Sequence, residues 1–361
     1  RGKIMKNKLM RSLSVCAAMV FLILSFAACG SQKSTQSSDK VVNIFTWANY
    51  VPDSVVKQFE KQTGIKVNYS NFSTNEEMLA KLQATKGSQY DVVICSDYII
   101  EVMSKQKEIL MQPIDKKNIP NYKNVDPQFL AQDYDKQNKY SIPYTLGTQM
   151  IVYNPEKVKI DIKGYKDLWN PQLKDSIVLV DDPRIVIGMT LKKLGYSMNE
   201  TDSKKLNQAS EELKKLKPNV KVFDADTPHN SLINGDVSVG YMYGSQASAA
   251  VKANPKFKIV YPEEGMNSEE DNFIIPVKAP HKENAEKFIN FMLNGKISNE
   301  ATTSNEYVNT NKAAKQYMSK EYLNNKAVYI PDAELKRAER FKDVGSATKT
   351  YDRIWSEFKQ Q

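Results

Sequence analysis

Aromatic and acidic side chains recur at the ends of segments that this sequence predicts to be β-strands. They occupy five such positions: Trp47-Ala48-Asn49-Tyr50, Ser96-Asp97-Tyr98, Asp181-Asp182, Tyr243 and Glu269-Glu270-Asp271. Because ligands of α/β proteins bind outside the carboxyl ends of parallel strands, these residues can share one site. Each residue taken alone is equally well explained as a turn former or a rim residue, so it is their joint occurrence that favours a site.

The chemistry that suits this set is the binding of an organic cation. The face of an aromatic ring attracts an ammonium group by about 0.5–2 kcal/mol once water is removed. A hydrogen bond between a carboxylate and a charged donor contributes about 1.5–3 kcal/mol. Aromatic rings and carboxylates that converge from several loops can therefore surround a small amine.

The sequence contains few residues that could form the usual catalytic and metal-binding motifs. Its two histidines, His229 and His281, lie in the turn-like contexts Thr-Pro-His and Ala-Pro-His. We find no glycine-rich phosphate loop and no HExxH, CxxC or EF-hand pattern, and Cys95 stands alone in an apolar run that predicts a buried thiol. We therefore expect no catalytic residue, no metal and no cofactor. Two alternatives stay open: a secreted carboxylate-based hydrolase, and a protein that binds ferric ion through some of the 19 tyrosines.

Hydrophobic periodicity predicts alternating strands and helices, which is typical of an α/β fold with right-handed crossovers. The predicted strands are Val41–Phe45, Ile65–Tyr69, Tyr90–Cys95, Ile177–Val180, Val220–Phe223, Val237–Tyr243, Ile259–Tyr261 and Asn272–Pro276. The predicted helices are Pro52–Thr63, Asn75–Thr85, Ile185–Leu194, Asp202–Lys215, Ser245–Ala253, Asn284–Leu293 and Tyr351–Lys359. The length of 361 residues suits two domains, and a hydrophobic share of 41% excludes a disordered chain. No Pro/Gly-rich linker separates two halves, so we expect two interwoven lobes joined by crossing strands that act as a hinge.

Residues 1–28 have the pattern of a secretory signal peptide, in which five basic residues precede the uncharged, apolar run Ser12–Ala28. Phe26-Ala27-Ala28-Cys29 resembles a bacterial lipobox, so Cys29 is the predicted lipidation site and the acyl chains would hold the protein at the membrane. The alternative is a transmembrane anchor, for which the run is slightly shorter than the ~20 apolar residues required. The polar residues 29–40 are expected to form a tether. The folded part is expected outside the cytoplasmic membrane, anchored to the cell membrane by lipid or periplasmic.

Much of the positive charge belongs to this leader. The formal net charge is +9, but without the five basic residues of 1–28 the chain holds 46 Lys and Arg against 42 acidic residues. The small remainder is spread along the chain, so we expect no nucleic-acid partner.

Several segments of the sequence match a known pattern: Val42–Pro52, Phe59–Val67, Ser73–Met78, Tyr140–Tyr144, Asp167–Trp169, Ile289–Leu293 and Tyr329–Ala333. They resemble the polyamine (spermidine/putrescine) substrate-binding proteins of bacterial ABC importers, and the likeness extends over Val41–Lys359. The resemblance implies a periplasmic-binding-protein-like fold whose two lobes close around a hinge and a central cleft. One lobe would comprise residues 41–147 plus about 272–315, the other about 148–271 plus 316–361. It also implies a monomer without enzymatic activity that delivers its solute to the permease subunits in the membrane.

By position, the resemblance implies an aromatic cage and two main carboxylates around putrescine or spermidine. Asp182 and Asp271 match the carboxylates, and Ser96 matches a polar contact. The cage residues would be Trp47, Tyr50, Tyr98, Tyr243 and Tyr307.

The chain departs from the family pattern at four positions. Asn49 and Ile185 stand where relatives tend to have acids, Glu269 where they have an aromatic residue, and Phe341 where they have Gln. Asp97 and Glu269 could restore part of the lost charge. The resemblance thus leaves the identity of the amine open: putrescine needs fewer anionic partners than spermidine, and another organic amine is an alternative.

Overall fold

The computed structural model describes residues 40–48 and 50–360. The predicted signal peptide, Cys29 and the tether up to residue 39 lie outside the described residues, as does Asn49. No helix of the described part is long and apolar enough to cross a membrane. One compact unit begins at Val42. It contains every helix described below and, apart from Val41, every strand of the sheet.

The strands of the described residues join in a mixed sheet with the order β2-β1-β3-β9-β4-β7-β5-β6. Their bounds are β1 Val41–Trp47, β2 Lys66–Phe72, β3 Val92–Ser96, β4 Ser141–Tyr153, β5 Ile177–Leu179, β6 Val220–Phe223, β7 Val239–Tyr243 and β9 Asn267–Ile274. Three short strands pair at the sides: β8 Lys258–Val260 and β10 Val308–Asn309 with β4, and β11 Glu339–Arg340 with β9. The predicted α/β class is therefore confirmed.

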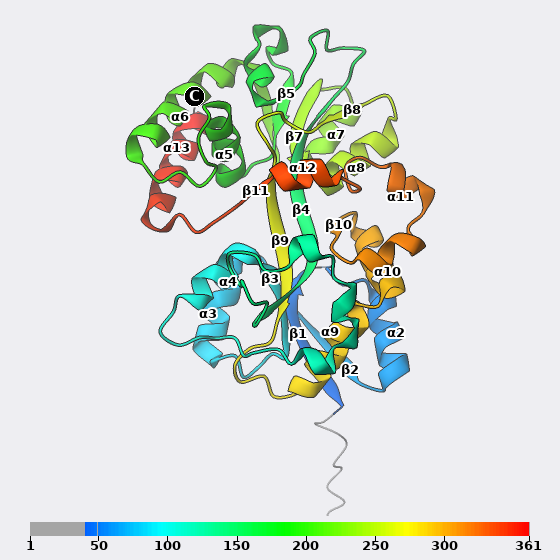
Figure 1. The fold of residues 1–361 in the computed structure, drawn as a ribbon. Helices are drawn as coiled ribbons and strands as arrows, with labels where there is room; N and C mark the ends of the chain where they lie inside the picture. The colour runs from blue at the N-terminus through cyan, green and yellow to red at the C-terminus, as the bar shows by residue number, and fades with distance from the viewer. Residues whose placement is uncertain (1–39, 49, 361) are drawn as a thin grey trace, which may run out of the picture. The chain divides into compact units, whose positions relative to one another are not determined.

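Parallel pairing occupies both ends of the sheet and antiparallel pairing occupies its middle. β1 pairs with β3, and β5 with β6 and β7, in parallel, whereas β9 is antiparallel to β3 and β4. In Figure 1, β4 and β9 run between a lower group of elements around β1–β3 and an upper group around β5–β7. These two strands are thus the elements that connect both groups.

The helices lie between the strands, as the sequence predicts. Their bounds are α2 Asp53–Thr63, α3 Asn75–Thr85, α4 Asp97–Ser104, α5 Pro183–Lys193, α6 Ser203–Leu216, α7 Pro228–Ile233, α8 Gly244–Ala253, α9 Lys282–Met292, α10 Gly295–Asn305, α11 Lys320–Asn324, α12 Asp332–Arg337 and α13 Thr348–Gln360. Short 3-10 helices cover Lys116–Asn118, Pro120–Asn124, Pro127–Phe129, Tyr165–Trp169, Pro171–Leu173, Lys217–Asn219, Lys312–Tyr317 and Gly345–Ala347. Gly64 ends α2 with φ +69°, a left-handed conformation that glycine adopts without steric cost.

Of the strands that differ from the sequence prediction, two connect the upper and lower groups, β4 and β9. β4 was not predicted, because Pro143 and Gly147 interrupt its apolar pattern with residues typical of turns. β9 begins at Asn267, five residues before the predicted strand, so Glu269 and Asp271 lie within the strand instead of in a loop before it. A polar strand forms here because β9 lies between two neighbours, β3 and β4, that satisfy its backbone groups.

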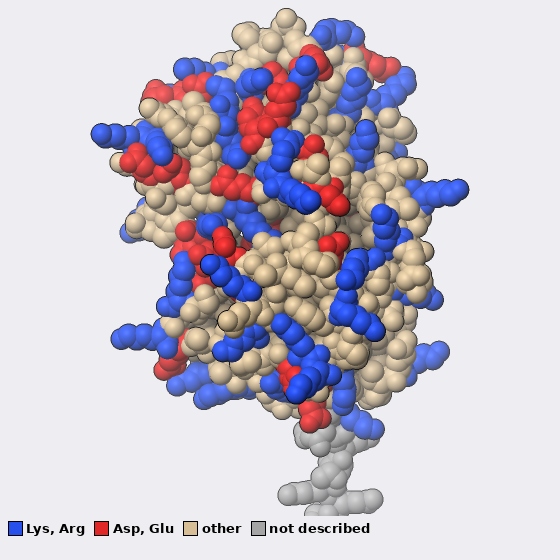
Figure 2. Space-filling view, in the orientation of Figure 1, with Lys and Arg blue, Asp and Glu red and all other residues tan. Residues whose placement is uncertain are grey.

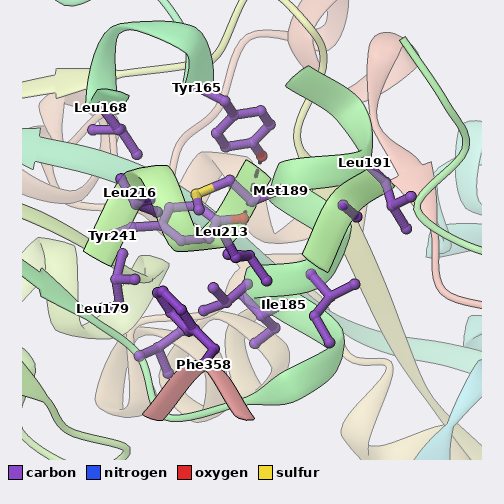
Figure 3. Packing of buried hydrophobic residues seen from close by; sticks show 14 of the residues in the cluster. Tyr165, Leu168, Leu179, Ile185, Met189, Leu191, Leu213, Leu216, Tyr241 and Phe358 are labelled. Carbon is purple, nitrogen blue, oxygen red and sulfur yellow. Dashed lines mark hydrogen bonds between the residues drawn. The ribbon is translucent and has the colours of Figure 1, made fainter. Parts of the chain in front are cut away.

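Figure 3 shows the hydrophobic cluster that supports α5. Ile185 and Met189 of α5 pack there with residues of other elements, among them the fully buried Tyr165 and Tyr241, whose hydroxyl oxygens are 3.2 Å apart. Burial of apolar side chains contributes about 1.5–3 kcal/mol each, so this cluster fixes the orientation of α5. The beginning of α5 is thereby held against the end of β5.

Candidate ligand-binding site

A cavity of about 790 Å³ brings together nine of the residues singled out in the sequence. Its volume lies in the range of small-molecule sites. The nine residues that line it are Trp47, Tyr50, Ser96, Tyr98, Asp182, Tyr243, Glu269, Asp271 and Tyr307. They come from both groups of elements connected by β4 and β9, so the cavity lies between these groups.

Asp271 is held by two hydroxyl groups. The hydroxyl of Tyr50 donates a short hydrogen bond to one carboxylate oxygen, and Ser96 Oγ donates to the other at 2.8 Å. The tyrosine hydroxyl also lies 2.7 Å from Thr145 Oγ1. Register explains the arrangement, because Asp271 lies opposite Ser96 on β3 and Thr145 on β4. Burial raises the pKa of Asp271 although both hydrogen bonds lower it.

Glu269 lies two residues before Asp271, on the same face of β9. Gly147 is opposite it on β4, so no side chain of that residue covers the space beside the carboxylate. Within the described part of the chain, the Glu269 carboxylate accepts no hydrogen bond and forms no ion pair. Burial, followed by the carboxylates of Asp182 and Asp271, holds its pKa well above the ordinary value.

Asp182 has a structural role as well as a place in the cavity. Its carboxylate accepts a hydrogen bond from the backbone N–H of Ile185 at 3.0 Å and so caps α5. Burial raises the pKa of Asp182 more than this bond lowers it. The cap fixes the side chain at the wall of the cavity.

The aromatic side chains are fixed by contacts with their neighbours. The rings of Tyr50 and Tyr307 have centroids 5.3 Å apart, and the Trp47 ring packs at 4.5 Å against Phe72. The Tyr98 hydroxyl donates to Glu76 at 2.9 Å. Rings held in this way present their faces to a ligand with little further loss of conformational entropy.

The lining is strongly acidic. Among the described residues that form it, seven carry a carboxyl group and one, Arg184, carries a positive charge. The guanidinium of Arg184 lies over the rings of Phe341 and Tyr351 at 5.1 and 5.0 Å and donates to Asn199 Oδ1 at 3.0 Å. The protein's own groups therefore already contact this one cation. Figure 2 shows Lys and Arg scattered among acidic residues over the visible outer face, whereas carboxyl groups predominate among the charged residues of the cavity lining.

The structure places Asp97 outside the cavity lining, which corrects the expectation that it restores charge to the site. Asp97 is 1% exposed, and its carboxylate accepts from the backbone N–H groups of Tyr98 and Glu270 at 2.8 and 3.3 Å. It also lies 3.6 Å from Arg340. As the first residue of α4, it turns its side chain toward the backbone and away from the ligand space.

Several lining residues were not singled out in the sequence. Glu76, Arg184 and Gln246 belong to the first turns of α3, α5 and α8, which all begin at the cavity. Their position could have been inferred from the rule that helices in α/β units begin near the ligand side of the sheet. Phe341 was noted only as a departure, and the structure places its ring in the lining under Arg184.

No group of three or more His, Cys, Asp or Glu side chains in the described residues is arranged to hold a metal ion. The arrangement of the cavity is that of a binding site for a cation that brings its own hydrogen-bond donors, since carboxylates only accept.

Comparison with known proteins identifies the family. Residues 54–329 match the family of bacterial extracellular solute-binding proteins. The chain belongs to this family. The spermidine/putrescine-binding periplasmic protein of Salmonella typhimurium is 39% identical to this solute-binding protein over 334 residues, which cover 92% of the chain and 95% of the relative.

Solved structures have the same fold as this solute-binding protein. The spermidine/putrescine ABC transporter substrate-binding protein PotD of Streptococcus pneumoniae superimposes with a TM-score of 0.80 at 34% identity, covering 89% of this chain and 99% of that one. The TpPotD lipoprotein of Treponema pallidum gives a TM-score of 0.79 at 28% identity, covering 89% of this chain and all of that one. The expected periplasmic-binding-protein-like architecture is thus confirmed.

Proposed function

We propose that this solute-binding protein captures a polyamine, putrescine or spermidine, in the acidic cavity and delivers it to the permease of an ABC importer. The relatives named for spermidine and putrescine binding support the ligand class. Capture involves no chemical conversion of the amine. The residues that contact the ligand would be the nine named lining residues together with Asn49, which lies outside the described residues.

The observation that carries this proposal is the combination of carboxylates and aromatic rings around one cavity. Asp182 and Asp271 would each contribute about 1.5–3 kcal/mol in hydrogen bonds to ammonium groups. Together with contacts between the ammonium groups and the rings, the gain is roughly 5–10 kcal/mol. Micromolar affinity corresponds to about 8 kcal/mol, so the set suffices for a dication with little margin for a trication.

The cellular setting belongs to the same proposal. Lipid modification of Cys29 would anchor the protein outside the cytoplasmic membrane. Residues 29–40 would form a tether, and the lipid anchor would be the protein's contact with the membrane. The lipoprotein of Treponema pallidum supports this anchoring, and the periplasmic relatives support the compartment. The protein would act as a monomer with two lobes, residues 41–147 plus about 272–315 and about 148–271 plus 316–361.

A thermal-shift screen tests the ligand class. A ligand present at 100 times its Kd raises the free energy of unfolding by about 2.7 kcal/mol, so a true ligand raises the melting temperature visibly. Putrescine, spermidine, spermine, amino acids and Fe³⁺ are compared, and we expect a shift with putrescine or spermidine. A protein indifferent to every amine, or stabilised by Fe³⁺ alone, would overturn the proposal.

The substitution Asp271→Asn then tests the site. It keeps the size of the side chain and removes its charge, so we expect calorimetry to show binding about 10-fold weaker or more. Glu263→Gln is the matched control, because Glu263 is exposed and its carboxylate forms a 3.5 Å ion pair with the exposed Lys166, away from the cavity lining. Unchanged affinity in the Asp271 variant would remove this residue from the site.

A further inference from the structure

Glu269 differs from the other acids around the cavity because no group of the described residues neutralises it. Asp271 has two hydroxyl donors and Asp182 caps α5. Glu76 accepts from Tyr98, and Glu306 pairs with Lys252. The Asp343 carboxylate accepts from the backbone N–H of Gly345, and Asp226 is exposed to solvent. Only Glu269 is half-buried and without a partner in the described chain. Such a carboxyl group favours either a proton or a cation from outside the protein.

The position of Glu269 relative to Asp271 defines the kind of cation. The two carboxylates project from the same face of β9, two residues apart, which is about 7 Å along an antiparallel strand. This spacing is close to the separation of the ammonium nitrogens in an extended four-carbon diamine. Gly147 lies opposite Glu269 on β4, so β4 places no side chain beside this carboxylate.

We infer that Glu269 binds the second ammonium group of a primary diamine whose first ammonium group Asp271 holds, and that Glu269 releases a proton as the diamine enters. The inference rests on the proposed function and narrows its ligand class. The step balances: the carboxylic acid of Glu269 gives its proton to solvent, and the resulting carboxylate pairs with an ammonium group that keeps its own protons.

The groups that face Glu269 raise its pKa while the cavity is empty, which favours the protonated form. Burial and the carboxylates of Asp182, Asp271 and Asp97 all raise its pKa, and only the guanidinium of Arg184 lowers it. The hydroxyls of Tyr98 and Tyr243 also face it, and burial raises their pKa values, so they add no charge near neutral pH. An ammonium group beside Glu269 favours the ionised form and reverses the balance. Affinity for the diamine therefore increases with pH, by at most about 10-fold per pH unit, until the carboxyl group is ionised in the empty protein.

Titration calorimetry with putrescine and with butylamine, which lacks the second ammonium group, separates the two ends of the site. Wild type, Glu269→Gln and the control Glu263→Gln are titrated at pH 7 in buffers with different ionisation enthalpies, which reveals proton release. Melting curves of the three proteins show whether each variant is folded.

We expect wild type and the control to bind putrescine with release of a proton. In Glu269→Gln the release should disappear and putrescine should bind about 10-fold more weakly, whereas butylamine should bind equally to all three proteins. Putrescine binding without proton release and with no effect of Glu269→Gln would overturn this inference and leave the proposed function intact. Equal weakening of putrescine and butylamine would also overturn it, because Glu269 would then act on the first ammonium group. A wild-type protein that binds no amine would overturn the proposed function itself.

Discussion

Acidic side chains on the two faces of β9 lie in opposite electrostatic environments. Glu269 and Asp271 face the cavity, while Glu270, between them, points to the other side of the sheet. Glu270 is fully buried and accepts a hydrogen bond from Arg340 Nη2 at 2.8 Å and a short one from the hydroxyl of Tyr134. Asp97 lies in the same cluster, 3.6 Å from Arg340 Nη1. Residues 40–48 and 50–360 thus supply a cation to the acids on one face and form no ion pair with Glu269 on the other.

This difference separates a structural ion pair from a binding site. Arg340 belongs to β11, which pairs with β9, and its guanidinium also lies 5.4 Å from the centre of the Tyr134 ring. The buried cluster therefore joins four distant segments of the chain, at Asp97, Tyr134, Glu270 and Arg340, on the face of β9 opposite the cavity. On the cavity side, a positively charged solute can supply the ion-pair partner of Glu269.

The strongest test of this comparison removes the internal cation. We expect Arg340→Met to lower the free energy of unfolding by about 3 kcal/mol, because Glu270 remains buried without the cation that contacts it at 2.8 Å. Urea denaturation of the ligand-free protein at pH 7 measures the effect. The exposed Arg337→Met is the control. It removes the Glu334 pair on α12 and an exposed hydrogen bond to the Glu263 carbonyl, and should change stability by less than about 1 kcal/mol.

A second substitution shows whether the loss comes from charge. Adding Glu270→Gln to Arg340→Met removes the unpaired carboxylate and should restore most of the lost stability. Should the single variant be as stable as wild type, the division between a structural face and a binding face of β9 would be wrong.

The next test concerns the unequal interaction of Arg340 with the two acids Glu270 and Asp97. Arg340 is closer to Glu270 than to Asp97, and burial raises the pKa of Asp97 to about 8 despite the lowering effect of Arg340. The unfolded chain ionises this carboxyl near its usual pKa of about 3.9. Between these two values the folded state holds a proton that the unfolded state has lost, so rising pH lowers stability by up to about 1.4 kcal/mol per unit.

The substitution Asp97→Asn removes this titration and leaves one side-chain oxygen, which can accept from Tyr98 N–H or from Glu270 N–H; the loss of the other bond does not depend on pH. We expect the stability of wild type relative to the variant to fall by about 2 kcal/mol between pH 5 and pH 7. Urea denaturation of both proteins at each pH gives the difference, in which other titrating groups cancel. Parallel pH profiles would show that Arg340 keeps Asp97 ionised in the folded protein.

The sequence predicted most elements and the clustering of residues at strand ends, because both depend on local patterns. The continuous apolar run before Cys95 gives β3, and the strand rule gathers Ser96 and Asp182 at one cavity. Local patterns could not predict that Arg340 is the ion-pair partner of Asp97. Its distance to Arg340 depends on the pairing of β11 with β9, a contact between segments far apart in the chain that no local pattern indicates.

The departures from the family pattern were visible in the sequence, but their structural consequences were not. Ile185 stands where an acid was expected, and it is 1% exposed within the hydrophobic cluster below α5. Phe341 is in the cavity lining, where its ring lies against Arg184. Whether a changed side chain faces the cavity or the core is decided by packing, which periodicity alone does not resolve for the first turn of a helix.

The smallest expected effect on stability concerns Asp182. This residue is both a structural acid, because it caps α5, and a candidate ligand-binding acid, because it lines the cavity. Asp182→Ala removes the hydrogen bond to Ile185 N–H, so the free energy of unfolding should fall by about 1 kcal/mol. Asp182→Asn keeps a capping oxygen, so its stability should stay within about 0.5 kcal/mol of wild type. Both variants lack the charge, and calorimetry should show both binding putrescine about 10-fold more weakly. If the Asn variant bound as tightly as wild type while only the Ala variant were weakened, Asp182 would serve the ligand by holding α5 in place, and its carboxylate would join Glu270 as a structural acid.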